Sequence, residues 1–199
     1  MTKSIKLKLI SVASFAGFIL IWWIITDVLQ LLNPYSLPSP FVVIQTFGKK
    51  IVSPSPDGSL LLAHILASLY IAVLGFIAGT VIGIPVGIAL AWNKKIEMLI
   101  KPVFDFLRTI PPIGWIPVMI IILGIGTEAK VAVIFIASFT PVVINTYSGI
   151  KQTNPIHLWV GQTFGATNFQ LLRKVAIPTS LPFVFTGLRV SFNLAWSCL

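Results

Sequence analysis

The stretch Lys151–Pro178 (KQTNPIHLWVGQTFGATNFQLLRKVAIP) decides how the rest of this chain is organised. Elsewhere long apolar segments are joined by short links, whereas here polar and cationic residues enter without loss of a helical pattern. Asn154 is placed to cap a helix whose first residue is Pro155. Gly165 supplies the positive φ at which such a helix ends. The first half of the stretch therefore predicts a short helix followed by a glycine turn.

The second half of the stretch carries its own helix signals. Thr167 and Gln170 have the spacing of a capping box, in which each side chain bonds the backbone N–H of the other residue. We expect a second short helix to run from here to Ala176 and to stop at Pro178, because proline cannot continue a helix. The stretch as a whole predicts a helical hairpin.

The predicted hairpin has one apolar side and a cationic end. The apolar side comprises Ile156, Trp159, Val160 and Phe164, and the cationic end Arg173 and Lys174. Two interpretations fit this pattern. The hairpin either lays its apolar side into the groove of a partner protein, or it lies flat on lipid headgroups. The pattern alone does not choose between them.

Composition places the chain in the membrane. Its 199 residues are 56% hydrophobic and only 10% charged, against about 25% charged residues in soluble domains. The formal charge of +9 is spread over the links between apolar segments instead of forming one basic face, which argues against nucleic acid as a partner. The sequence predicts an integral membrane protein in contact with the lipid bilayer.

The chain offers little for catalysis or metal binding. Its single cysteine, Cys198, excludes an internal disulfide and a cysteine-cluster metal site, and His64 and His157 lie far apart. The Gly48-Lys49 pair lacks the rest of a phosphate-binding loop. We expect no cofactor, no metal and no enzymatic activity in this chain. Any nucleotide hydrolysis must come from a separate protein.

Five apolar segments are candidates for membrane spans: 9–32, 60–92, 110–125, 131–147 and a last one from about 181. The first is interpreted as a retained signal anchor. With these spans, nine lysine and arginine residues lie on the same side as the N-terminus and the hairpin, and three lie on the other side. Because cytoplasmic links carry more positive charge, we expect the N-terminus and the hairpin in the cytoplasm. A short helix that Ser39-Pro40 starts is expected on the outer surface. We expect one transmembrane domain over 1–199, truncated at its C-terminus because the sequence ends within an apolar segment.

Glycine recurs at every fourth position of the second apolar segment, at Gly75, Gly79, Gly83 and Gly87. At helical spacing these glycines form a smooth ridge that another helix can approach closely. Tight helix packing is the predicted role. A flexible hinge aided by Pro85 is the alternative.

The third apolar segment is expected to be a broken helix. Pro102–Thr109 is predicted to be helical, with Asp105 and Arg108 paired three residues apart, and Asn93–Lys101 is predicted to be a link. The 16 apolar residues that follow span roughly 24 Å, short of a core near 30 Å, and contain Pro111 and Pro112. Broken helices at membrane depth line pathways or are buried in protein, so a transport pathway and a plain kink both remain open.

Arg189 falls near the middle of the last predicted span, and Asn193 shares its helical face. Arg189 is interpreted either as part of an anion-attracting pathway wall or as a buried partner of a carboxylate such as Asp105.

The hairpin resembles the EAA loop of binding-protein-dependent ABC importer permeases. In that motif Glu-Ala-Ala is followed at fixed spacing by Gly, two apolar residues and Pro. Gly165, Val175, Ile177 and Pro178 match it in this sequence. The leading triplet is Trp159-Val160-Gly161, so the glutamate of the motif is absent.

A second resemblance narrows the family to the branch of nitrate, taurine and alkanesulfonate permeases. It is carried by Leu107–Pro117, Leu123–Gly126, Asn145–Ile150 and the ending from Gly187-Leu188-Arg189 to Ala195-Trp196. The same branch includes permeases for thiamine-precursor pyrimidines, so this resemblance does not fix the solute.

The resemblance implies an all-α type I (MetI-like) importer permease that acts as a homodimer with ABC ATPase subunits and an extracytoplasmic solute-binding protein. It implies alternating access in the cell membrane, and we expect a small anion such as nitrate, a sulfonate or taurine as solute. An ion-gradient-driven transporter and a non-transporting membrane scaffold are the alternatives. The residues expected to couple to the ATPase are Ile156, Trp159, Val160, Gly161, Phe164, Gly165, Ala166, Arg173, Lys174 and Pro178. The pathway candidates are Arg108, Pro111, Pro112, Trp115, Asn145, Arg189 and Asn193.

Overall fold

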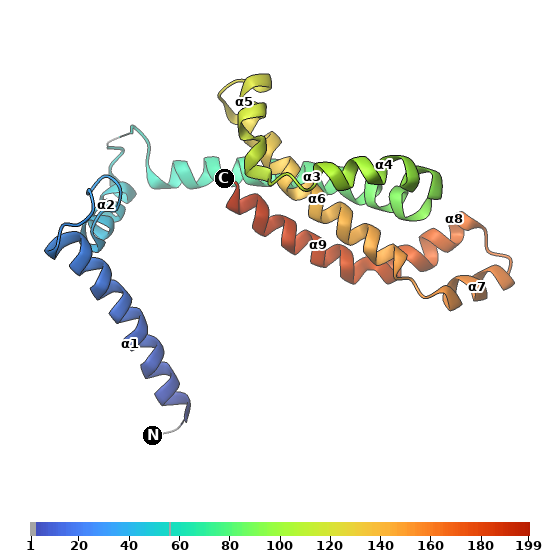
Figure 1. Cartoon of the computed structure of the whole chain (residues 1–199), viewed down its shortest axis with the longest axis horizontal. Coiled ribbons are helices and arrows are strands. Elements are labelled where there is room, and N and C mark those ends of the chain that lie inside the picture. Colours follow the sequence, from blue (N-terminus) through green and yellow to red (C-terminus); the bar gives the residue numbers. More distant parts are fainter. Residues whose placement is uncertain (1–2, 56) are drawn as a thin grey trace. The chain divides into compact units, whose positions relative to one another are not determined.

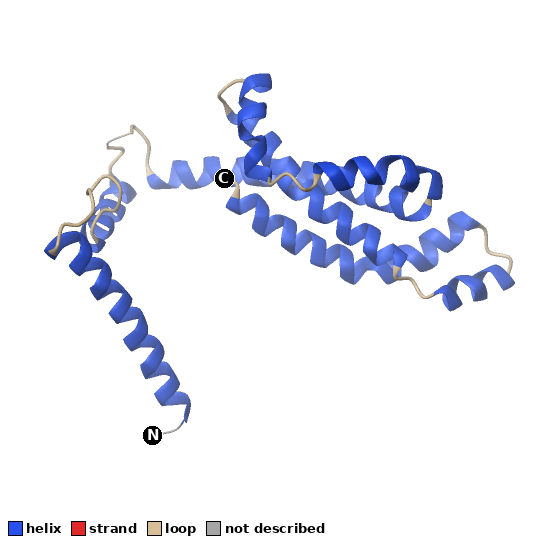
Figure 2. Cartoon of the chain, viewed as in Figure 1, coloured by secondary structure: helices blue, strands red, loops and turns tan. Residues whose placement is uncertain are grey.

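The computed structural model describes residues 3–55 and 57–199, and every regular element in these ranges is helical (Figures 1 and 2). Four helical stretches are long and apolar enough to cross a membrane, namely Lys6–Val28, Leu61–Trp92, Thr127–Lys151 and Asn168–Ser197. A bent helix pair, Lys94–Leu107 with Pro112–Leu123, gives a fifth candidate. The predicted all-α membrane bundle with about five spans is confirmed. The chain divides into two compact units, residues up to Ile65 and residues from Leu66 onward.

The first unit contains α1 (Lys3–Trp23), a π-helical turn (Ile24–Val28) and α2 (Pro40–Val52). Ser39 caps α2 as predicted, since its hydroxyl accepts from the backbone N–H of Val42 at 3.4 Å. One side of α2 is exposed and apolar; it comprises Phe41, Ile44, Phe47 and Ile51.

A charged cluster follows α2. The Lys50 ammonium donates to Asp57 and to the Ser59 carbonyl, and His64 Nε2 lies 2.9 Å from Asp57 Oδ2. The hydrogen bond from Lys50 lowers the pKa of Asp57 to about 2. These contacts hold the segment between α2 and the start of α3 (Leu61–Trp92).

The core of the second unit is the contact between α3 and α6 (Thr127–Lys151). A Cβ atom placed on Gly79 would lie 2.8 Å from Ser138 Cβ and 2.9 Å from the backbone nitrogen of Phe139. Each ridge glycine faces one residue of α6, in the pairs Gly75–Ile134, Gly79–Ser138, Gly83–Val142 and Gly87–Thr146. The residue numbers of the paired positions increase in the same direction along both helices, so α3 and α6 run parallel.

The other side of α6 packs against α9 (Ile177–Ser197). Gly149 of α6 meets Ser180 and Phe183, whereas Gly187 of α9 meets Asn145. The numbers here run in opposite senses, so α9 is antiparallel to α6, and the two helices lie side by side in Figure 1. With α6 between α3 and α9, the bundle buries small and β-branched residues along its whole length.

The helix after α3 is longer than predicted. Residues Asn93–Lys101 are not a link, because α4 spans Lys94–Leu107 and Asn93 caps it by accepting from the backbone N–H groups of Lys95 and Ile96. Pro102 lies inside α4. Because proline has no N–H, the helix lacks one hydrogen bond to the Met98 carbonyl. The helix does not begin at Pro102, contrary to the sequence-based prediction. A 3₁₀ turn (Pro112–Trp115) and α5 (Ile116–Leu123) follow, bent by 87° from α4, as expected for a broken helix.

The predicted stop at Pro178 is wrong. After α7 (Pro155–Thr163) and α8 (Asn168–Leu171), a π-helical turn (Leu172–Ala176) leads directly into α9, so one helical stretch runs from Asn168 to Ser197. The Ile177 N–H donates to the Leu172 carbonyl, five residues back, and this wider turn makes room for the ring of Pro178. The second arm of the hairpin, which comprises α8 and the π-helical turn, is therefore continuous with a membrane span. The first arm is α7.

Candidate functional site

The hairpin has the local structure that its sequence predicts. Asn154 Oδ1 accepts from the Ile156 N–H at 2.9 Å, which starts α7. Gly165 turns the chain with φ of 77°. Both capping-box bonds are present, at 3.3 Å from the Gln170 N–H to Thr167 Oγ1 and 2.8 Å from the Thr167 N–H to Gln170 Oε1. Three separate local signals thus fix the ends of the two arms.

The two arms are packed together at Gly161. A Cβ atom there would lie 2.5 Å from Leu171 Cδ2, so any other residue would require the Leu171 side chain to move. Ala166 is half-buried beside this contact, and Leu171 is 2% exposed. The sequence analysis missed Leu171, whose apolar character and place on the inner side of the second arm were the available signals.

The apolar residues of α7 are not covered by any other described part of the chain. Phe164 is 86% exposed and Trp159 63%, and Ile156 and Val160 are exposed as well. Phe169, which the sequence analysis did not single out, adds a further exposed ring on the second arm. Arg173 and Lys174 are exposed too. The hairpin therefore exposes both bulky apolar side chains and two cations.

The base of the hairpin is fixed by a polar cluster that the sequence analysis missed. Glu97 of α4 accepts hydrogen bonds from the Tyr147 hydroxyl and from the Lys151 ammonium, the latter at 2.7 Å. Lys151 is the last residue of α6, and Thr153 Oγ1 lies 3.1 Å from Thr179 Oγ1 at the start of α9. The available signal was that Glu97 is the one carboxylate among the cations of Asn93–Lys101. These contacts connect α4, α6 and α9 where the hairpin leaves the bundle.

The pathway candidates do not converge on one place. Pro111, Pro112 and Trp115 lie at the bend between α4 and α5, where the indole N–H of Trp115 is buried without a hydrogen-bond partner among the described residues. Asn145 lies in the contact between α6 and α9, where its amide donates to the Pro141 carbonyl at 2.8 Å.

Arg189 and Asn193 both lie on the exposed side of α9, one turn apart. The interpretation of Arg189 as a buried partner of Asp105 is wrong, because Asp105 is paired with Lys101 and Arg108 on its own helix. Helix α9 turns its small residues, Gly187, Ser191 and Ala195, inward, which leaves Arg189 on the opposite side.

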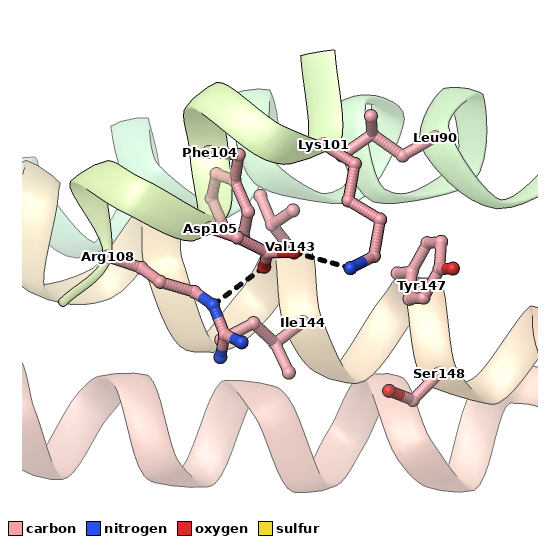
Figure 3. Close-up of a pocket in the computed structure, with 9 residues that line it drawn as sticks. All are labelled: Leu90, Lys101, Phe104, Asp105, Arg108, Val143, Ile144, Tyr147 and Ser148. Atoms are coloured by element: carbon pink, nitrogen blue, oxygen red, sulfur yellow. Dashed lines mark hydrogen bonds and ion pairs between the residues drawn. The ribbon is translucent and has the colours of Figure 1, made fainter. Parts of the chain in front are cut away.

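Arg108 lies at a cavity of about 140 Å³ between α3, α4 and α6 (Figure 3). Arg108 Nε is 2.8 Å from Asp105 Oδ1, and Lys101 Nζ is 2.5 Å from Asp105 Oδ2. The lining comprises Leu90, Lys101, Phe104, Asp105, Arg108, Val143, Ile144, Tyr147 and Ser148. No group of His, Cys, Asp or Glu within the described ranges could hold a metal ion.

The site thus belongs to a multi-pass helical bundle of parallel and antiparallel spans, with one helical hairpin projecting from its end. Residues 79–198 match the family model of the binding-protein-dependent transport system inner membrane component. The chain belongs to this family, within the branch of nitrate, taurine and sulfonate permeases. It is therefore a non-enzymatic transporter component.

Individual relatives cover nearly the whole chain. The taurine transport system permease protein TauC of Escherichia coli is 33% identical over 193 residues, 96% of this chain and 69% of that protein. The bicarbonate transport system permease protein CmpB of Synechococcus elongatus is 33% identical over 194 residues, 94% of this chain and 68% of that protein. The formylaminopyrimidine transport permease protein ThiX of Halalkalibacterium halodurans is 34% identical over 164 residues, 82% of this chain and 63% of that protein.

The fold has a counterpart among solved structures. The MetNI methionine ABC transporter in an inward-facing conformation aligns with a TM-score of 0.58 at 21% identity, over 67% of this chain and 68% of that chain. This likeness supports the MetI-like bundle.

Proposed function

We propose that this chain is the membrane subunit of an ATP-driven importer in the cytoplasmic membrane. Two copies form the transport unit as a homodimer, two separate ATPase subunits bind the hairpins, and an extracytoplasmic solute-binding protein delivers the solute. The 1–199 chain acts as one permease domain. The single observation that carries this proposal is the exposed apolar side of α7, which gains free energy only when a partner covers it.

The proposed orientation puts the N-terminus and the hairpin in the cytoplasm. The excess of lysine and arginine in the links on that side supports it. The helix directions support the alternation of the spans that this orientation assumes. Spans that alternate in direction make α3 and α6 parallel and α9 antiparallel to them, as the glycine contacts require.

In the proposed mechanism the hairpin is a lever. ATP binds the closed ATPase dimer better than the open one, so it favours the state in which the two hairpins come together. The second arm continues into α9 without a break, and Glu97 joins the base of the hairpin to α4. A displacement of the hairpin is therefore passed directly to two membrane helices, which supports alternating access by rocking of the two permease copies.

The proposed solute is a small oxyanion such as a sulfonate or nitrate. Arginine at the centre of a membrane span costs roughly 2.5–3.5 kcal/mol unless it faces protein or water. Arg189 and Asn193 are exposed on α9, so we assign them to a water-filled pathway between the two copies, in which an anion compensates the charge of Arg189. The names of the taurine and bicarbonate permeases support an anion. A pyrimidine, as named for another relative, is the second candidate.

The experiment that tests the proposal compares ATPase binding by the native chain and by Phe164→Asp. Both are tagged, co-expressed with an ABC ATPase subunit from the same organism, and purified in detergent. Loss of a central aromatic contact costs about 2 kcal/mol, so we expect roughly 30-fold weaker ATPase capture. The matched control is Phe47→Asp, which changes an exposed phenylalanine of α2 and is expected to capture as much ATPase as the native chain. Equal capture by Phe164→Asp and native chain would remove the hairpin from the mechanism and favour a scaffold that binds lipid headgroups.

A further inference from the structure

The cavity between α3, α4 and α6 has two kinds of wall. The apolar part is formed by Leu90, Phe104, Val143 and Ile144. The polar part is formed by Lys101, Asp105, Arg108, Tyr147 and Ser148, whose side chains gather around the cavity in Figure 3. Tyr147 lies one turn before the end of α6, so the cavity is in the half of the bundle from which the hairpin projects.

Helix packing does not explain the charge of Arg108 at this cavity. Lys101, Asp105 and Arg108 all belong to α4, and both ion pairs of Asp105 stay within that helix. Ion pairs of this kind contribute only a few tenths of a kcal/mol to helix stability. Contacts of three kinds join α4 to α6: Glu97 accepts from Tyr147 and Lys151, the Lys101 ammonium lies 5.7 Å from the centroid of the Tyr147 ring, and Phe104 packs edge-to-face on Phe139. Asp105 therefore gathers two cations at the cavity, of which Lys101 also contacts α6, whereas the ion pair of Arg108 stays on its own helix.

Counting donors and acceptors shows which ligand the cavity can take. Each oxygen of Asp105 already faces a cation, Lys101 on one side and Arg108 on the other. Among the described residues, the two terminal nitrogens of Arg108 and the hydroxyl of Ser148 have no protein hydrogen-bond partner; the Arg108 side chain is 42% exposed, so these nitrogens are open to solvent and to a ligand. Unused donors thus outnumber unused acceptors, and the three charged side chains sum to +1. Such a cavity favours a ligand that brings oxygen acceptors and one negative charge.

Size and shape narrow the ligand further. The free edge of a guanidinium binds two oxygens of a planar or tetrahedral oxyanion at once. A volume of about 140 Å³ equals roughly five water molecules at liquid density, enough for an oxyanion head with a short carbon tail. The apolar part of the lining suits that tail.

We propose that the cavity lined by Lys101, Arg108, Tyr147 and Ser148 is a binding site for a small oxyanion with three oxygens, a sulfonate with a short apolar tail. Arg108 binds two oxygens, Ser148 donates to a third, and Lys101 neutralises the remaining charge. Asp105 holds both cations toward the cavity when it is empty. Taking this anion for the transported solute rests on the proposed function, whereas binding itself does not require the ATPase.

The test measures binding of radiolabelled ethanesulfonate to the purified full chain in lipid nanodiscs by equilibrium dialysis. We expect saturable binding by the native chain and about tenfold or more weaker binding by Arg108→Gln. Arg108→Lys should bind with intermediate affinity, because lysine keeps the positive charge but cannot bind two oxygens at once as a guanidinium does. Ser148→Ala tests the same site without a change of charge and should bind a few-fold more weakly. Lys95→Gln removes an exposed cation from the same helix and is the matched control, with unchanged binding expected.

Three results would overturn the assignment: absence of saturable binding by the native chain, native affinity in Arg108→Gln, or a loss confined to Arg189→Gln, which would place the anion at α9. Circular dichroism of each variant distinguishes loss of the site from loss of the fold. If Arg108→Gln does not fold, binding by Ser148→Ala decides whether the oxyanion site exists. ATPase capture by the native chain is measured in parallel. Its failure counts against the proposed function, and the binding result still decides whether the oxyanion site exists.

Discussion

The glycine ridge of α3 and the apolar side of α7 are both regular helical patterns. Within the described part of the chain, only the glycine ridge is covered by another helix. Gly75, Gly79, Gly83 and Gly87 are buried against α6, where the absence of side chains lets two backbones approach. The large side chains of α7 point away from the bundle and are exposed. The first pattern is thus satisfied within one copy of the chain. The second is left uncovered by the described part of the chain, and in the proposed function the ATPase covers it.

The strongest way to break the ridge is Gly79→Leu. Even a Cβ atom at this position meets the backbone of α6 at 2.9 Å, so neither helix can yield without separating from the other. We expect a loss of about 3 kcal/mol or more, seen as a lower thermal midpoint and a lower yield of monodisperse protein in detergent. The control is Gly48→Leu in α2, where a Cβ atom meets nothing within 4 Å. If both variants have the same thermal midpoint as the native chain, the glycine ridge does not hold α3 against α6.

A smaller effect is expected where the two regions join, at Glu97. The change Glu97→Gln keeps a hydrogen-bond acceptor for Tyr147 and Lys151 but removes the charge that pairs with the half-exposed ammonium. Amide hydrogen exchange of residues 151–154 should become roughly two- to fivefold faster, because a partly exposed ion pair contributes little. The rest of α6 should exchange as before.

The control for this variant is Glu128→Gln, which removes an exposed carboxylate at the other end of α6. Exchange at residues 151–154 that is identical in Glu97→Gln, Glu128→Gln and the native chain would show that Glu97 does not hold the base of the hairpin.

The sequence predicted the features that depend on neighbours in the chain. Asn154, Gly165 and the Thr167–Gln170 pair act over three or four residues, so their helix ends could be read directly. The broken helix at Pro111 and Pro112 follows from the missing N–H groups and the short apolar length. The spans themselves follow from composition.

The features that the sequence did not predict depend on contacts between distant residues or on a competing local geometry. Glu97 acts on Tyr147, fifty residues away, and no local pattern marks this contact. The exposed position of Arg189 is set by the small residues of α9 that turn toward α6. Pro178 was expected to end a helix because proline usually does so, but the π-helical turn before it accommodates the ring. The functional roles of the hairpin and pathway residues stay predictions.

The central claim is that a separate ATPase covers the hairpin from the cytoplasm. It is tested by maleimide labelling of Phe164→Cys in a Cys198→Ser background, in inside-out membrane vesicles made with and without the co-expressed ATPase. We predict rapid labelling without the ATPase and at least tenfold slower labelling with it, since a side chain at the centre of an interface is excluded from solvent. Equal labelling rates in the two preparations, or labelling only from the extracytoplasmic side, would contradict the claim.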